Sequence, residues 1–146
     1  MRKRLYIAAP FKQKQLVLDV AALVEPLGYE LLARWLGHEY QHEGGINNPA
    51  NHDYARMSAE HDLNDARKAD LMIVLQIPHE GSHYGWLVEL GIGLAQAEEV
   101  WIVGDVVNVF SFLSGLQENG CMVRRFESLW EMTEYINRER SAYVER

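Results

Sequence analysis

The sequence lacks the features that mark secreted, membrane and polynucleotide-binding proteins. Its only cysteine is Cys121, so no disulfide can form within the chain. The apolar stretch after the basic start ends at Pro10, which is too short for a signal peptide or a membrane span. Basic residues number 14 against 21 acidic ones and form no dense cluster, so a phosphate backbone would be repelled on average. We therefore expect a cytoplasmic protein that binds neither membranes nor polymeric nucleic acid.

Two common nucleotide-binding signatures are also missing. No Gly-x-Gly-x-x-Gly follows the first apolar run, no P-loop occurs, and Cys121 lacks the setting of an activated thiolate. These absences remove the main support for redox and nucleoside triphosphatase functions. No Gly/Ser, Pro or Gln tract suggests a linker, so residues 1–146 are expected to form a single domain.

The apolar residues alternate between short continuous runs and helical spacing. Strands are expected at residues 5–9, 29–35, 71–75, 100–103 and 121–126, and helices at residues 16–27, 55–68, 86–97 and from Ser128 onward. The uninterrupted run at residues 71–75 is typical of a central strand. This alternation predicts an α/β fold, a flavodoxin-like or Rossmann-like doubly wound open parallel sheet of about five strands with helices on both faces.

Ligands of doubly wound sheets bind outside the carboxyl ends of the strands. In this chain those ends are residues 8–11, the segment from Trp35 onward, residues 76–84 and residues 104–108. Residues 37–53, which include two glycines in succession and Pro49, are expected to form a long loop. These segments should hold the functional site.

Glu89 is the first candidate for a catalytic residue. It stands among apolar neighbours, one turn into the helix expected at residues 86–97. The helix dipole favours a negative charge there by about 0.3–1 kcal/mol, so this carboxylate can stay ionised although it is partly desolvated. Such a group suits a nucleophile, and the other interpretation is a solvated or loop-capping glutamate.

Asp62 is the second candidate, at a position where the apolar pattern requires no carboxylate. If it reaches the carboxyl edge of the sheet, two carboxyl groups become available, as glycoside chemistry uses for attack and proton transfer. The alternative is an acidic helix surface.

His38, Glu39 and His42 match the His-Glu-x-x-His zinc pattern, in which two imidazoles share one helical face. The match lies between Gly37 and Gly44, however, so a helix long enough to hold both ligands is not expected. Histidines on a loop at the active site are the alternative.

Four short motifs carry a resemblance to a known family. They are residues 5–11 (Leu-Tyr-Ile-Ala-Ala-Pro-Phe), Asp62 with Leu63, Ala69 with Asp70 before a buried strand, and residues 88–91 (Val-Glu-Leu-Gly). Their order and separations resemble the nucleoside 2-deoxyribosyltransferase superfamily, which includes deoxynucleoside 5'-monophosphate N-glycosidases. The resemblance runs in outline from Tyr6 to Phe126, and it is loose in the loop at residues 37–53 and in the last helix.

The resemblance implies roles for single residues. Glu89 would attack the anomeric carbon, Tyr6 would hold Glu89 by a hydrogen bond, and Asp62 would lie near the scissile bond and the base. Phe11 would flank the base. The substrate site would further include Pro10, Trp35, Ser82, His83 and Gly85, with Ser82 able to hold a 5'-phosphate where transferases often carry an aspartate. Asn108 and Ser111 would serve a neighbouring subunit's pocket, which implies a homodimer or a larger homo-oligomer with shared active sites.

The function expected from this resemblance is the transfer of a deoxyribosyl group from a deoxynucleoside to another nucleobase through a covalent Glu89 intermediate. The partners would be a deoxynucleoside or deoxynucleotide and a free nucleobase, with no metal and no cofactor. The nearest alternative is a deoxynucleoside 5'-monophosphate N-glycosidase, which transfers to water. More distant alternatives are a zinc hydrolase using His38 and His42, and a nucleotide-binding module without catalysis.

Overall fold

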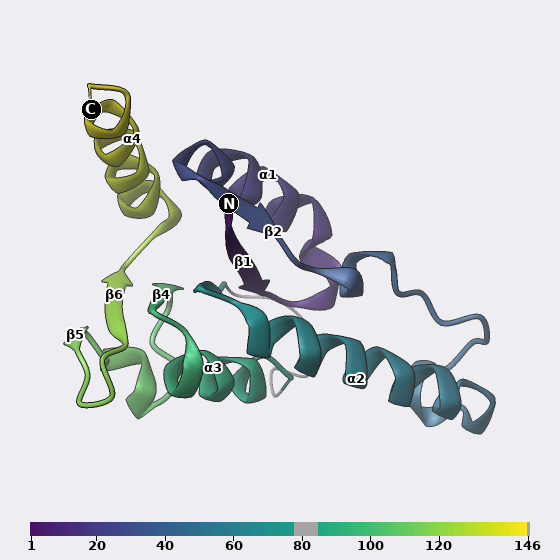
Figure 1. Ribbon diagram of the computed structural model, residues 1–146. Coiled ribbons are helices and arrows are strands. Elements are labelled where there is room, and N and C mark those ends of the chain that lie inside the picture. Colours follow the sequence, from purple (N-terminus) through teal and green to yellow (C-terminus); the bar gives the residue numbers. More distant parts are fainter. Residues whose placement is uncertain (78–84, 146) are drawn as a thin grey trace.

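A mostly parallel sheet lies at the centre of the computed structural model, which describes residues 1–77 and 85–145 (Figure 1). Within these residues six strands form the sheet, and all neighbours are parallel except β5, which is antiparallel to β6. In spatial order the strands are β2 (Tyr29–Leu31), β1 (Lys3–Ala8), β3 (Leu71–Gln76), β4 (Glu99–Gly104), β6 (Met122–Phe126) and β5 (Gly115–Leu116). This architecture confirms the predicted doubly wound α/β fold.

Helices cover both faces of the sheet (Figure 1). The helices α1 (Lys14–Val24) and α4 (Leu129–Glu145) pack together on one face, and α2 (His52–Lys68) and α3 (Gly85–Gln96) pack together on the other. Short 3-10 turns join the elements: η1 (Phe11–Gln13), η2 (Glu25–Leu27), η3 (Arg34–Gly37), η4 (Gly45–Asn47), η5 (Pro49–Asn51) and η6 (Val109–Phe112). In the part of the chain that the structure describes, no helix has the length and apolar character needed to cross a membrane.

The core follows the apolar runs of the sequence. Every residue of β3 is buried, as expected for a central strand with helices on both sides. On the α3 side the packing is close, because a Cβ added to Gly93 would lie 2.6 Å from the Sδ of Met72. A glycine at this position therefore allows α3 to lie directly on β3.

The second strand was predicted too long, and one strand was not predicted. Residues 29–35 were expected to be extended, but β2 ends at Leu31 and η3 begins at Arg34. The reason is a tertiary contact: the backbone N–H of Arg34 donates to Asp65 of α2 at 3.1 Å, which draws the chain away from the sheet. The strand β5 has only two residues, too few for a periodic signal.

The start of the last helix agrees with its predicted cap. Ser128 Oγ accepts a hydrogen bond from the backbone N–H of Glu131 at 3.2 Å. The Glu131 carboxylate accepts from the backbone N–H of Glu127 at 2.8 Å, one residue before the position that a capping box uses.

The sheet reverses its strand order between β1 and β3. The chain leaves β1 toward β2 over one face and reaches β3, on the other side of β1, over the opposite face. Such a reversal opens a crevice at the carboxyl ends of the two strands, which is where ligands bind in this class of sheet. The residues after β1 and the helix that follows β3 therefore flank the expected site.

Candidate active site

Tyr6 and Glu89 meet at this crevice. Tyr6 lies on β1 and is fully buried, and Glu89 lies one turn into α3, which packs on β1 and β3. The Tyr6 hydroxyl donates a hydrogen bond to Glu89 Oε1 at 2.8 Å. Because the sheet fixes Tyr6 and the packing of α3 fixes Glu89, the carboxylate has a defined position at the carboxyl edge.

The surroundings of Glu89 change its ionisation. Burial raises the pKa of Glu89 to about 7, against the hydrogen bond from Tyr6, which lowers it, and the charge of Asp62 raises it further. Burial and the neighbouring Glu89 also raise the pKa of Tyr6, so the phenol stays protonated and remains a donor.

Asp62 faces the same cavity from α2. Burial raises its pKa to about 6, the charge of Asp65 adds to this effect, and Arg34 opposes it. The Oδ1 atom of Asp62 is buried and has no hydrogen-bond partner, which disfavours the ionised form. Two carboxyl groups that titrate near neutrality therefore border one cavity.

The cavity has a volume of about 470 Å³, within the usual range for a small-molecule site. Aromatic side chains from separate segments form its walls: Phe11, Trp35, Tyr40, Tyr54 and Trp86. The rings of Phe11 and Trp35 lie with their centroids 6.3 Å apart, tilted by 41°. Pro10 and Gly85 also line the cavity. Flat apolar walls beside two carboxyl groups suit a planar base joined to a polar sugar.

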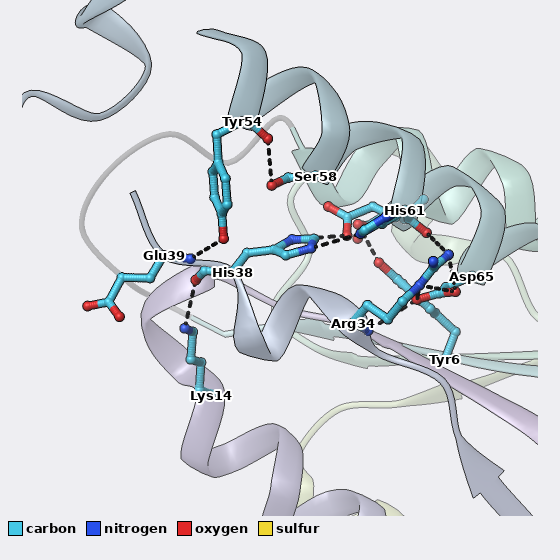
Figure 2. A network of polar contacts seen from close by, with 11 residues as sticks. Tyr6, Lys14, Arg34, His38, Glu39, Tyr54, Ser58, His61 and Asp65 are labelled. Carbon is cyan, nitrogen blue, oxygen red and sulfur yellow. Dashed lines mark hydrogen bonds and ion pairs between the residues drawn. The ribbon is translucent and has the colours of Figure 1, made fainter. Parts of the chain in front are cut away.

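A polar network around His38 joins the chain after β2 to α2 (Figure 2). His38 lines the cavity and is only 8% exposed. Its Nδ1 lies 3.9 Å from Asp62 Oδ1, and its Nε2 is hydrogen-bonded to His61 Nδ1 at 3.3 Å. Lys14 Nζ donates to the backbone carbonyl of His38 at 3.1 Å. The sequence left two interpretations of His38 open, a zinc ligand and a histidine on a loop at the active site, and its position in the cavity wall agrees with the second.

An ion pair that the sequence gave no sign of holds the loop against α2. The Arg34 Nε lies 3.1 Å from both carboxylate oxygens of Asp65, whose side chain is buried (Figure 2). Farther along, the Tyr54 hydroxyl accepts a hydrogen bond from the backbone N–H of Glu39 at 2.8 Å. These contacts fix the path of the chain after β2 and, with it, the positions of Trp35 and His38.

The two histidines of the zinc pattern do not have the geometry that the pattern requires. Residues 38–42 contain no helix, so His38 and His42 do not share a helical face. His38 is buried beside Asp62, and the side chain of His42 is exposed. Among the described residues, no group of three or more histidine, cysteine, aspartate or glutamate side chains could hold a metal ion.

Asn108 and Ser111 lie outside this cavity. Ser111 is fully buried, and its hydroxyl donates to Gln76 Oε1 at 3.0 Å. The side chain of Asn108 accepts from the backbone N–H of Phe110 at 2.9 Å and caps η6. Both side chains thus hold the turn after β4 within the chain itself. Ser82 and His83 lie outside the described residues.

The fold and the cavity define a doubly wound α/β protein in which two carboxyl groups line one cavity at the switch point. A solved structure is similar to it: Clostridium botulinum CMP N-glycosidase, BcmB, with a TM-score of 0.56, 14% sequence identity, and coverage of 92% of this chain and 99% of that chain. At this identity the likeness shows a shared fold. No protein-family model matches the chain, and no curated protein matches it in sequence.

Proposed function

We propose that this protein cleaves the N-glycosidic bond of a nucleoside or nucleoside monophosphate, with Glu89 as nucleophile and Asp62 as general acid. The observation that carries the proposal is the hydrogen bond from Tyr6 to Glu89 in a cavity that Asp62 also lines. The order of the sequence motifs supports it, as does the fold shared with a CMP N-glycosidase.

In the first step, the Glu89 carboxylate attacks the anomeric carbon. The bond from that carbon to the base nitrogen breaks, its electron pair goes to the base, and protonated Asp62 gives its proton to the base. In the second step, an acceptor attacks the same carbon, Asp62 takes the acceptor's proton, and the bond to Glu89 breaks. Every proton is accounted for, because Asp62 ends in the state in which it began.

Positive charge develops on the sugar as the base leaves. An anionic carboxylate held in a desolvated site stabilises this charge more strongly than water does, because it is already oriented. The Tyr6 hydroxyl supplies that orientation at 2.8 Å and favours the ionised form of Glu89. The aromatic walls would hold the base while its bond breaks.

Water is the proposed acceptor, and this revises the transfer to a second base expected from the sequence motifs. Two observations favour it: the structurally similar protein is an N-glycosidase, and Ser82 and His83 occupy the loop in which the resembling transferases often carry an aspartate. Transfer to a second nucleobase is the alternative, with the same nucleophile.

A substrate panel tests the proposal. Deoxyadenosine, deoxycytidine and the 5'-monophosphates of ribo- and deoxyribonucleosides are each incubated with the protein, with and without a second base, and the products are separated by chromatography. We expect free base without any added acceptor. A product that forms only with a second base would establish transfer instead, and binding without cleavage by the wild type would overturn both.

We also propose that a second copy of the chain covers the segment after β4. This segment exposes large apolar side chains on both sides of Asn108: Val106, Val107, Val109, Phe110 and Phe112. Light scattering on the purified protein should give the mass of a homodimer or a larger homo-oligomer. A monomer at micromolar concentration would contradict this part of the proposal.

A further inference from the structure

His38 is held in place from several sides. Its backbone N–H donates to Trp35 O at 3.0 Å, and its carbonyl accepts from Lys14 Nζ. Its ring stacks on His61 with a centroid distance of 5.4 Å and meets the edge of Tyr54 at 6.0 Å. An imidazole fixed in this way has little freedom to turn toward solvent, so its two ring nitrogens keep their present neighbours.

Those neighbours are Asp62 on one side and His61 on the other. His38 Nδ1 lies 3.9 Å from Asp62 Oδ1, the buried oxygen that has no hydrogen-bond partner. His38 Nε2 is hydrogen-bonded to His61 Nδ1. The distance to Asp62 is longer than a hydrogen bond, but contacts of catalytic groups are often long in ligand-free sites and shorten when substrate binds. His61 is half-buried, so the row of three groups runs from the cavity toward the surface.

These surroundings favour the neutral form of the His38 imidazole. Burial lowers its pKa, as do the charges of His61, Arg34 and Lys14, whereas Asp65 opposes them. A neutral imidazole has one N–H and one lone pair, so it can donate at one nitrogen and accept at the other. The titratable and charged groups that surround this row are Tyr6 of β1, Lys14 of α1, Arg34 of η3, Tyr54, His61 and Asp65 of α2, and Glu89 of α3.

We propose that His38, backed by His61, is a positioning residue that forms a hydrogen bond with Asp62 when substrate binds, in either protonation state of Asp62, and exchanges the Asp62 proton with solvent. This inference rests on the proposed role of Asp62 as the acid. When Asp62 is protonated, its O–H donates to His38 Nδ1, and His38 Nε2–H donates to His61 Nδ1. When Asp62 is ionised, His38 Nδ1–H donates to the carboxylate, and His61 Nδ1–H donates to His38 Nε2.

The two arrangements differ by one proton. Going from the first to the second, Asp62 gives its proton to His38 Nδ1, His38 gives the Nε2 proton to His61 Nδ1, and His61 gives its Nε2 proton to water. The reverse sequence lets an ionised Asp62 regain its proton from solvent before the first step, even while substrate fills the cavity. Asp62 therefore does not need to receive its proton through the part of the cavity that the base fills.

Kinetics of His38→Ala and His61→Ala test the inference, with His42→Ala as the matched control. His42 lies in the same loop, but its side chain is exposed, and its bonds to Asn51 come from the backbone. We expect His38→Ala to lower kcat by about tenfold to hundredfold, less than the roughly 10²–10⁴-fold contribution of an acid itself, with KM changed less than kcat. His61→Ala should have a smaller effect of the same kind, and His42→Ala should have none.

Two readouts separate a proton role from a merely structural one. Free imidazole should restore part of the lost kcat of His38→Ala. A 4-nitrophenyl glycoside of the same sugar, whose leaving group departs without a proton, should be cleaved by His38→Ala nearly as fast as by the wild type. An unchanged kcat, or equal losses on both substrates without imidazole rescue, would overturn the inference.

A spectroscopic measurement keeps the inference testable without turnover. The ¹⁵N resonances of His38 report which ring nitrogen carries the proton, and they should change when Asp62→Asn removes the titrating carboxyl group. Resonances identical to those of the wild type across pH 5–8 would overturn the inference. If instead the wild type cleaves no member of the substrate panel, or Glu89→Gln stays active, the proposed function fails while the ¹⁵N result still stands.

Discussion

Two walls of the same cavity are held in place by different means. The Glu89 wall, in which the buried Tyr6 holds Glu89 from behind, is built on a buried strand and on a helix packed directly against the sheet. The Asp62 wall, made of His38 and Asp62, joins a half-exposed part of α2 to a chain segment without regular structure. Side-chain contacts such as the Arg34–Asp65 ion pair position this second wall.

The difference matches the chemistry proposed for each wall. A nucleophile must approach the anomeric carbon from one direction, so a rigid support that fixes its position favours the attack. An acid must be protonated when substrate is bound, and the proposed row of Asp62, His38 and His61 would connect it to solvent for that purpose. Changes to the Glu89 wall should therefore affect both folding and activity, whereas changes to the Asp62 wall should mainly affect proton transfer.

The largest effect is expected for Glu89→Gln. This variant keeps the shape of the side chain but removes the attacking carboxylate, so kcat should fall by about 10⁴-fold or more. Chromatographic assay of the released base measures the loss. Glu98→Gln is a matched control, because the Glu98 carboxylate pairs with Lys3 on the surface, and it should keep wild-type activity. Activity of Glu89→Gln within tenfold of the wild type would exclude the covalent mechanism.

Asp62→Asn should have the next largest effect. Loss of the general acid should lower kcat by about 10²–10⁴-fold. In the wild type, Asp62 must be protonated and Glu89 ionised, so kcat/KM should follow a bell around pH 6–7, with limits that belong to the coupled pair. Asp62→Asn should lose the alkaline limb. Its remaining limb, on the acid side, should then follow the ionisation of Glu89 alone. An unchanged bell would assign the acid to another group.

Tyr6→Phe should have an intermediate effect. A hydrogen bond to a charged group contributes about 1.5–3 kcal/mol, so its loss should slow cleavage by about tenfold to hundredfold. The Tyr6 hydroxyl lowers the pKa of Glu89, so the pH profile should shift to higher pH in this variant. Tyr29→Phe, on the neighbouring strand and outside the cavity, is the control. A pH profile identical to that of the wild type would show that Tyr6 does not act on Glu89.

The smallest effect on chemistry, and the clearest on folding, is expected for Gly93→Ala. The added Cβ would clash with Met72, and such overpacking costs about 1–3 kcal/mol of unfolding free energy. Gly91→Ala is the matched control: nothing lies within 4 Å of its Cβ, so the variant should gain up to about 1 kcal/mol from helix propensity. Urea unfolding measures both. Equal stabilities would mean that α3 does not pack on β3 as described.

The two walls also differ in how far the sequence predicts them. The strand at residues 71–75, the helix that carries Glu89 and the doubly wound order follow from apolar periodicity, because their side chains face one core. The pairing of Tyr6 with Glu89 was expected from the family resemblance, and a bond of 2.8 Å joins them. Regular elements thus position this wall.

The Asp62 wall was predicted in part only. Asp62 was expected from the resemblance. For its neighbour His38 the sequence left open a zinc ligand or a histidine on a loop at the active site, and it gave no sign of the contact with Asp62. His38 and Asp62 are 24 positions apart in the sequence. The loop between them has no periodic pattern of apolar residues from which their contact could be predicted. The early end of β2 has the same cause, since the Arg34–Asp65 contact overrides the extended tendency of residues 29–35. Contacts of this kind depend on single side chains, and local patterns do not encode them.

Trapping the glycosyl-enzyme tests the central claim most directly. A nucleoside whose sugar carries fluorine at carbon 2 slows the release step, so a covalent adduct should accumulate. Mass spectrometry of the digested protein should find one added sugar on the peptide that contains Glu89, and none in Glu89→Gln. Release of the base from this substrate without any adduct on Glu89, or an adduct on another residue, would contradict the account.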